Sequence, residues 1–173
     1  MVVQNNQLSK NLNSFGLLGQ KAEFFILPLE KYQPNFHSYK SEKINSLSRL
    51  TELHIPTVPL PYYLKQDTYL YYFRRRELNS VAIIQLKEVF RKIKKAGYNL
   101  TVRPSVFVPD IPGFEFIVPN AVNIPTFNEL LKAIKTGYEK MIAEAKRPEI
   151  VEFIYVIQGF YTSNRCGLAQ TDD

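Results

Sequence analysis

The fold is decided by two stretches of sequence, LTVRPSVF at residues 100–107 and IVEFIYVIQGFY at residues 150–161. Both are rich in β-branched and aromatic residues, which is typical of strands. The second stretch is apolar at nearly every position, so we predict that it lies in the centre of a sheet. The first stretch carries Arg103 and the second carries Gln158, polar side chains that are unusual within such apolar runs. The same two strands therefore predict both the sheet and its candidate functional residues.

Helical patterns surround these strands. Four segments have apolar residues at helical spacing or at helix-forming composition, and they are residues 41–53, 67–76, 78–96 and 126–147. Gly97 is placed to end the third helix, and Thr126 with Glu129 forms a capping-box pattern that starts the fourth. A short strand at residues 23–29 and an extended, proline-rich run at residues 55–61 complete the pattern. The predicted fold class is α+β, a mixed sheet with helices packed on it.

Length and composition set the broad class of protein. The chain has 173 residues, of which 45% are hydrophobic and 22% charged, which is typical of a globular domain with a real core. Its single cysteine, Cys166, excludes an internal disulfide, so we expect a reducing, cytoplasmic setting. No apolar run approaches the ~20 residues of a membrane helix, and no membrane partner is predicted. Residues 1–22 are polar and are predicted to form an N-terminal arm.

The net charge of +6 favours anionic partners such as phosphates, nucleotides or nucleic acid. Basic residues cluster at residues 74–76 and 91–95, although such clusters are commonly the solvated faces of helices. Beside the first cluster lies a stripe of aromatic side chains, Tyr62, Tyr63, Tyr69, Tyr71, Tyr72 and Phe73. This stripe can stack on single-stranded nucleic acid or pack a helix onto the sheet. Packing is the commoner role, so nucleic acid is kept only as an alternative partner.

Three signatures in register carry a family resemblance. They are SEKINSLSRL at residues 41–50 with LHIPTVPLPYY at 53–63, VRPSVFVPD at 102–110, and YVIQGFY at 155–161 with CGLAQTDD at 166–173. In this order they resemble the N-terminal part of the ATP-binding domain of phosphoenolpyruvate synthase, pyruvate phosphate dikinase and rifampicin phosphotransferase. The resemblance covers residues 23–173 and implies a partial, ATP-grasp-like nucleotide-binding domain. It further implies ATP binding for phosphoryl transfer, as in a kinase or dikinase.

The resemblance implies four ligand-binding residues: Lys43, Arg103, Ser105 and Gln158. Lys43 and Arg103 fall on the family's phosphate-binding positions, and Gln158 lies where the family holds the adenine edge. We therefore predict that Lys43, Arg103 and Gln158 point into one shared cleft. Structural roles stay open for each: Lys43 at the surface, Arg103 paired with Asp110 or a helix carboxylate, and Gln158 bonded to neighbouring backbone.

Departures from the family pattern limit the predicted activity. The two glycines before the lysine are replaced by Ser41 and Glu42, and the loop that closes over the phosphates is shorter at residues 116–121. Glycines let backbone N–H groups approach phosphate closely, so ATP binding is expected to be weak or lost. No catalytic residue and no metal ligand is assigned, and whether the chain acts as an enzyme is left open.

The family domain continues beyond the segment matched here. The family's magnesium-binding residues lie in a later strand, so Mg²⁺ is expected only if the missing half is supplied by a second subunit or downstream domains. The resemblance also predicts an exposed or intermolecularly paired sheet edge at residues 150–173. The alternative function is a non-catalytic interaction or nucleic-acid-binding module on the same scaffold.

Overall fold

The structure is a computed structural model that describes residues 24–32, 42–53, 59–109 and 117–161 of the chain. Its helices are α2 (Glu42–Glu52), α3 (Gln66–Arg75), α4 (Ser80–Lys95) and α5 (Phe127–Glu144), with short 3-10 turns η1 (Leu29–Lys31) and η3 (Pro148–Ile150). The strands are β1 (Ile26–Pro28), β2 (Tyr62–Leu64), β3 (Asn99–Phe107), β4 (Ala121–Ile124) and β5 (Glu152–Phe160). The predicted α+β class is confirmed.

The strands form one sheet in the order β1-β2-β5-β3-β4, and every neighbouring pair is antiparallel. The prediction of a mixed sheet is therefore wrong for the described residues. Helical crossovers do join strands that run in the same direction: α3 and α4 connect β2 to β3, and α5 connects β4 to β5. However, β5 lies between β2 and β3, and β3 lies between β4 and β5, so no parallel-running strands become neighbours.

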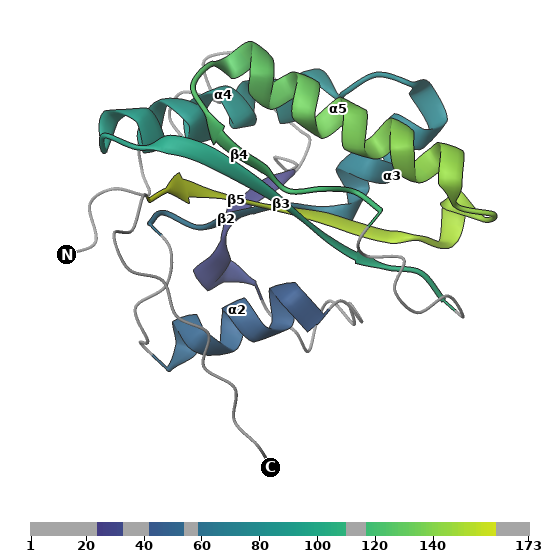
Figure 1. The fold of residues 1–173 in the computed structure, drawn as a ribbon, viewed down its shortest axis with the longest axis horizontal. Coiled ribbons are helices and arrows are strands. Elements are labelled where there is room, and N and C mark those ends of the chain that lie inside the picture. Colours follow the sequence, from purple (N-terminus) through teal and green to yellow (C-terminus); the bar gives the residue numbers. More distant parts are fainter. Residues whose placement is uncertain (1–23, 33–41, 54–58, 110–116, 162–173) are drawn as a thin grey trace, which may run out of the picture.

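Helices cover the two faces of the sheet unequally (Figure 1). α3, α4 and α5 lie on one face, and α2 lies on the other. The larger core is packed between the sheet and helices α3, α4 and α5, with buried side chains such as Leu86, Ile134 and Tyr155. A smaller core beneath α2 joins Leu29 and Ile44 to the sheet. The sheet is thus sandwiched, and each face has its own set of side chains.

Aromatic rings form the centre of the larger core. The ring of Tyr138 on α5 lies 5.0 Å from that of Phe153 and 5.4 Å from that of Tyr69, measured between centroids. The Tyr155 ring lies 4.8 Å from Phe153. All four side chains are buried. Aromatic pairs at these separations add to the free energy of burial by about 1 kcal/mol each.

The predicted capping box at the start of α5 and the predicted glycine after α4 are confirmed. However, α4 begins two residues later than predicted, at Ser80, and α5 ends three residues earlier, at Glu144. Thr126 caps α5 by accepting from the backbone N–H of Glu129, whose carboxylate accepts from the backbone N–H of Thr126. Asn79 caps α4 through its side-chain oxygen, which accepts from the N–H groups of Val81 and Ala82. Gly97 follows α4 with φ +88°, a conformation that a residue without Cβ adopts easily.

The central position predicted for the strand at residues 150–161 is also confirmed, since β5 pairs with β2 on one side and β3 on the other. The predicted exposed edge is consequently wrong for residues 152–160. The edges of the described sheet are instead β1 and β4, which are among its shortest strands. Short edge strands offer fewer unpaired backbone groups to other chains.

Several predicted features lie outside the described residues: the N-terminal arm at 1–22, most of the extended run at 55–61, Asp110, and the segment from Cys166 to Asp173. Within the part of the chain that the structure describes, no helix is long and apolar enough to cross a membrane.

Candidate functional site

The candidate residues lie on the side of the sheet that faces α2. Along β3 the side chains of Leu100, Val102 and Val106 join the larger core, so the intervening Thr101, Arg103 and Ser105 point to the opposite face. On β5, Ile154 packs in the smaller core beneath α2, which puts Val156 and Gln158 on the same side. We call the set Thr101, Arg103, Ser105, Val156 and Gln158 the α2 face.

Strand register brings Arg103 and Gln158 together on this face. Arg103 lies opposite Val156, and Thr101 lies opposite Gln158. Arg103 and Gln158 are therefore diagonal neighbours, with Cα atoms roughly 7–8 Å apart by general sheet geometry. Arg103 and Gln158 are 55 residues apart in the sequence, and they lie on one face of the sheet, as the family resemblance predicted.

Lys43 and Ser105 hold the start of α2 against β3. The ammonium group of Lys43 donates to the carbonyl oxygen of Pro104 at 2.6 Å. The N–H of Ile44 donates to the hydroxyl oxygen of Ser105 at 3.2 Å, which satisfies one of the otherwise unpaired donors of the first helical turn. Ser105 is only 1% exposed. Both side chains lie on the predicted face, but these hydrogen bonds join them to backbone groups of the protein.

Arg103 is half-buried and differs from Lys43 in its contacts. Among the described residues, no hydrogen bond or ion pair engages its guanidinium group. The predicted alternative partner Asp110 lies outside those residues. A partly desolvated guanidinium with five donors is suited to a carboxylate or phosphate group.

Thr101 and Gln158 form a buried polar pair without described partners. Each side chain is 5% exposed, and the two residues face each other across β3 and β5. The Thr101 hydroxyl oxygen and the Gln158 Oε1 atom are buried, yet no hydrogen-bond partner for either lies in the described part of the chain. Because buried polar atoms are nearly always hydrogen-bonded, this pair marks a place where the structure presents unmet bonding capacity.

Tyr63 on β2 extends the polar set. It lies opposite Val156, it is fully buried, and its hydroxyl also has no described partner. Burial raises the pKa of Tyr63 to about 12, so the hydroxyl stays protonated at neutral pH. Sequence reasoning missed both Tyr63 and Thr101 as site residues. The period-two alternation around Arg103 could have identified Thr101, whereas the short β2 strand gave no comparable pattern.

The side chains follow one order along the face. Lys43 and Ser105 lie at the start of α2, Arg103 comes next, and Thr101 with Gln158 comes last. From Ser105 to Thr101 the strand rises about 14 Å, at ~3.4 Å per residue. The Arg103 guanidinium and the Gln158 amide, placed in this order, can contact a molecule that has phosphates at one end and a hydrogen-bonding ring at the other.

Three of the six side chains of the aromatic stripe are buried and cannot stack on nucleic acid. Tyr63, Tyr69 and Tyr72 are buried, and Tyr69 packs in the aromatic centre of the larger core. The pKa of Tyr72 is raised to about 12, mainly by burial and to a smaller extent by the hydrogen bond that its hydroxyl donates to Glu139 at 2.7 Å. The packing interpretation is confirmed for these three rings.

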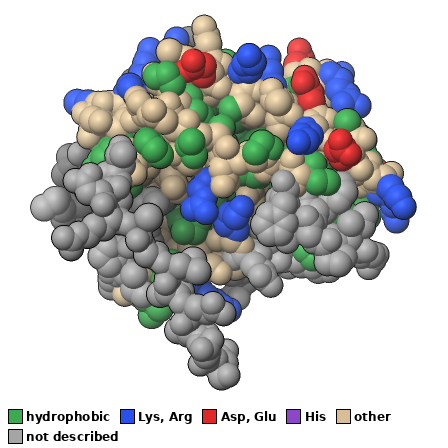
Figure 2. Space-filling model, viewed as in Figure 1, with side chains coloured by type: hydrophobic (Ala, Val, Ile, Leu, Met, Phe, Trp, Pro, Cys, Tyr) green, Lys and Arg blue, Asp and Glu red, His purple; other side chains and the backbone are tan. Residues whose placement is uncertain are grey.

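Positive charge is spread over the face of the molecule shown in Figure 2. Figure 2 shows Lys and Arg side chains at many separate places on the face in view, where they outnumber Asp and Glu. The basic residues at 74–76 and Arg91, Lys92, Lys94 and Lys95 are exposed, as the solvated-face interpretation predicted. Within the described ranges, no group of three or more His, Cys, Asp or Glu residues could hold a metal ion.

Comparison with models of protein families and with curated proteins found no match to this chain. The interpretation of the α2 face therefore depends on its own geometry and chemistry.

Proposed function

We propose that this chain is the nucleotide-binding part of a phosphotransferase similar to phosphoenolpyruvate synthase and pyruvate phosphate dikinase, and that it binds ATP weakly on the α2 face. Arg103 contacts the phosphates, and Gln158 with Thr101 contacts the edge of the base. The remaining groups for phosphoryl transfer, including those that hold Mg²⁺, come from a second subunit or from further domains.

One observation carries this proposal: the Arg103 guanidinium and the buried Gln158 Oε1 atom lie next to each other on one face, and neither has a hydrogen-bond partner among the described residues. An unsatisfied buried polar atom costs about 1–3 kcal/mol, so a ligand that completes these hydrogen bonds recovers that free energy. Adenine offers an N6 amino donor to Gln158 Oε1 and a ring nitrogen that accepts from the Thr101 hydroxyl.

The contacts of Lys43 argue for binding rather than transfer. Its ammonium group is hydrogen-bonded to the Pro104 carbonyl, so it would have to leave that oxygen to contact a transferring phosphoryl group. Transfer of a phosphoryl group depends on cations placed in advance around the developing charge. Arg103 alone supplies part of that stabilisation.

A second candidate function is a non-catalytic interaction module on the same scaffold. The observation in its favour is that Lys43 and Ser105 both fasten α2 to β3, which gives two of the four predicted site residues a structural task. On this view the α2 face binds an anionic group of a partner macromolecule through Arg103.

Titration with Mg-ATP, followed by calorimetry or by NMR shifts, tests the first proposal. We expect a dissociation constant in the millimolar range, near −4 kcal/mol. Arg103→Ala should remove most of the binding, and Arg103→Lys should restore it only in part because an ammonium cannot bind two oxygens in a fork. Arg75→Ala, an exposed residue on α3, is the matched control for loss of one positive charge.

Comparison of ligands separates the two candidates. If the nucleotide-binding proposal is correct, ATP should bind more tightly than tripolyphosphate, and Gln158→Leu should abolish that difference. Equal binding of the two ligands would favour a general anion site and the interaction module. Unchanged ATP affinity in Arg103→Ala would rule out the α2 face as the nucleotide site.

A further inference from the structure

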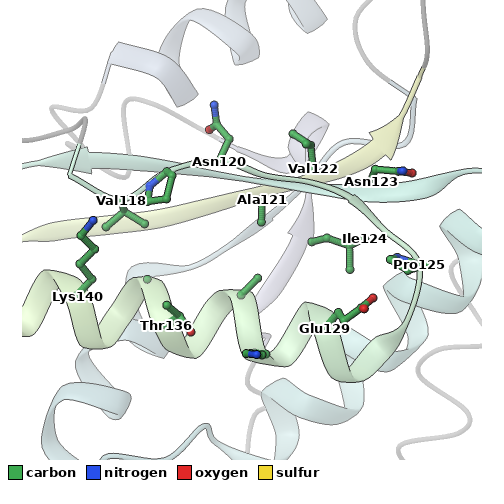
Figure 3. Close-up of a pocket in the computed structure, with 14 residues that line it drawn as sticks. Val118, Asn120, Ala121, Val122, Asn123, Ile124, Pro125, Glu129, Thr136 and Lys140 are labelled. Atoms are coloured by element: carbon green, nitrogen blue, oxygen red, sulfur yellow. The ribbon is translucent and has the colours of Figure 1, made fainter.

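An open groove lies between the edge strand β4 and helix α5 (Figure 3). Helix α5 covers the side of the sheet opposite α2 (Figure 1). The volume of the groove is about 530 Å³. The side chains of Ala121 and Ile124 on β4, and of Val118 just before it, point toward the helix and form part of the groove's apolar lining (Figure 3). From α5, Ala133 and Gly137 present little side-chain bulk to it.

The strand side of the groove is a sheet edge. Among the described residues, β4 pairs with β3 alone, so its outer backbone faces away from any described strand. Val122 is 58% exposed, and its side chain points away from α5 (Figure 3). An edge strand presents backbone N–H and C=O groups that a further extended chain can pair with. A groove between such an edge and a helix suits an added strand, which places alternate side chains against the helix.

Two lysines give the groove a positive charge that can contact a ligand. Lys132 and Lys140 line it from α5, and both are exposed with no described hydrogen-bond or ion-pair partner. Lys140 extends toward the strand beside Val118 (Figure 3). The single lining carboxylate, Glu129, is engaged in the capping box with Thr126.

Lys135 adds to this charge from the adjoining hollow on α5. The carboxylate in that hollow, Glu139, accepts from the hydroxyl of Tyr72 at 2.7 Å. Both nearby carboxylates therefore have protein donors, whereas the lysines have none among the described residues.

We infer that this groove binds an extended, acidic peptide segment of a partner protein, which adds to the sheet as a strand beside β4. The small apolar side chains of such a segment fill the groove beside Ala133. Gly137, the other small residue on α5, is already covered by Tyr155 and Val118. The carboxylates of the segment pair with Lys132 and Lys140. Nucleic acid fits the groove less well, because none of the fourteen residues that line it is aromatic and so none can stack on a base.

The test uses a short synthetic peptide with alternating valine and glutamate, labelled for fluorescence anisotropy, and the whole chain. We expect it to bind, and we expect the same peptide with lysine in place of glutamate not to bind. Lys132→Glu/Lys140→Glu should weaken binding about tenfold or more, and added salt should weaken the wild-type complex. Thr136→Trp, at an exposed position that lines the groove, should block binding without a change in charge.

Lys87→Glu/Lys92→Glu on α4 is the matched control, since both residues are exposed and neither lines the groove. It carries the same change of net charge and should bind the peptide nearly as well as the wild type. NMR shifts on peptide addition should centre on residues 118–124. Equal loss in the two double variants, equal binding of the lysine peptide, or shifts confined to the α2 face would overturn the inference. Self-association that Thr136→Trp abolishes would instead assign the groove to a second copy of the chain.

Discussion

Replacement of Thr101 by Val tests whether the buried polar pair on the α2 face exists for a ligand. The hydroxyl oxygen of Thr101 is buried without a described partner, and the side chain is 5% exposed. Valine keeps the β-branched shape that suits a strand and removes the hydroxyl. Since an unsatisfied buried polar group costs about 1–3 kcal/mol, Thr101→Val should raise the free energy of unfolding by about 1–2 kcal/mol.

The assay is urea unfolding of the chain without ligand, followed by Mg-ATP titration of the same variants. Thr101→Val should move the urea midpoint upward with an unchanged slope, and it should weaken nucleotide binding. Such a gain in stability with a loss of binding is the behaviour expected where a site residue has been kept at a cost to the fold.

Thr126→Val provides a control of opposite sign. The Thr126 hydroxyl accepts from the N–H of Glu129, so its removal should lower stability by about 1 kcal/mol. If Thr101→Val also lowers stability by a similar amount, its hydroxyl has a partner in the folded chain. The unmet bonding capacity assigned to the α2 face would then be refuted, and the case for a base-binding pair with it.

Two further predictions concern the fold. Burial raises the pKa of Tyr63 from 10 to about 12, so unfolding releases its proton more easily and stability should fall as the pH rises from 10 to 12. Tyr63→Phe should reduce this loss by about 1 kcal/mol per pH unit in urea titrations, and an unchanged slope would contradict the burial of that hydroxyl. Gly137→Ala should destabilise by about 1–3 kcal/mol, because a Cβ there would overlap the Tyr155 hydroxyl. Tyr155→Phe in the same chain should recover part of that loss in thermal unfolding, and full stability of the single variant would contradict the close packing of α5 on β5.

The elements that sequence patterns predicted well are the long ones. Helices α4 and α5 have apolar side chains at helical spacing over several turns and caps at Asn79 or Thr126, so local and global preferences agree. The central strand β5 was predicted from a run that is apolar at nearly every position. The short strands β2 and β4 were missed as strands, because three or four residues cannot show an alternation and their pairing depends on distant β5 and β3.

The antiparallel sheet could not be read from the element order. Strands joined by helices commonly become parallel neighbours. The order of elements along the chain does not show that β5 inserts between β2 and β3. That insertion is set by tertiary packing. It is favoured because β5 is apolar on both faces and is buried most completely at the centre of the sheet. It also determines the site, since the pairing of β5 with β3 places Gln158 opposite Thr101.

Predictions for individual site residues had mixed outcomes for physical reasons. Side-chain direction on a strand follows from parity, so the shared face of Arg103 and Gln158 was predictable once both strands were known. The partner of Lys43 was not predictable, because its long side chain finds the Pro104 carbonyl only after α2 has docked on β3. Lys43 was predicted either to bind phosphate or to lie at the surface, and this hydrogen bond to the backbone matches neither role.

The location of the two proposed sites makes them separable by experiment. The α2 face depends on side chains of β3 and β5 that point away from α5, whereas the groove depends on the outer edge of β4 and on α5 itself. The larger core lies between the two, and it packs its rings at centroid distances near 5 Å. Because close-packed cores resist small displacements, a charge change at Lys140 should leave the α2 face in place. Loss of peptide binding without loss of nucleotide binding would therefore report the groove alone, and the reverse result would report Arg103 and its neighbours.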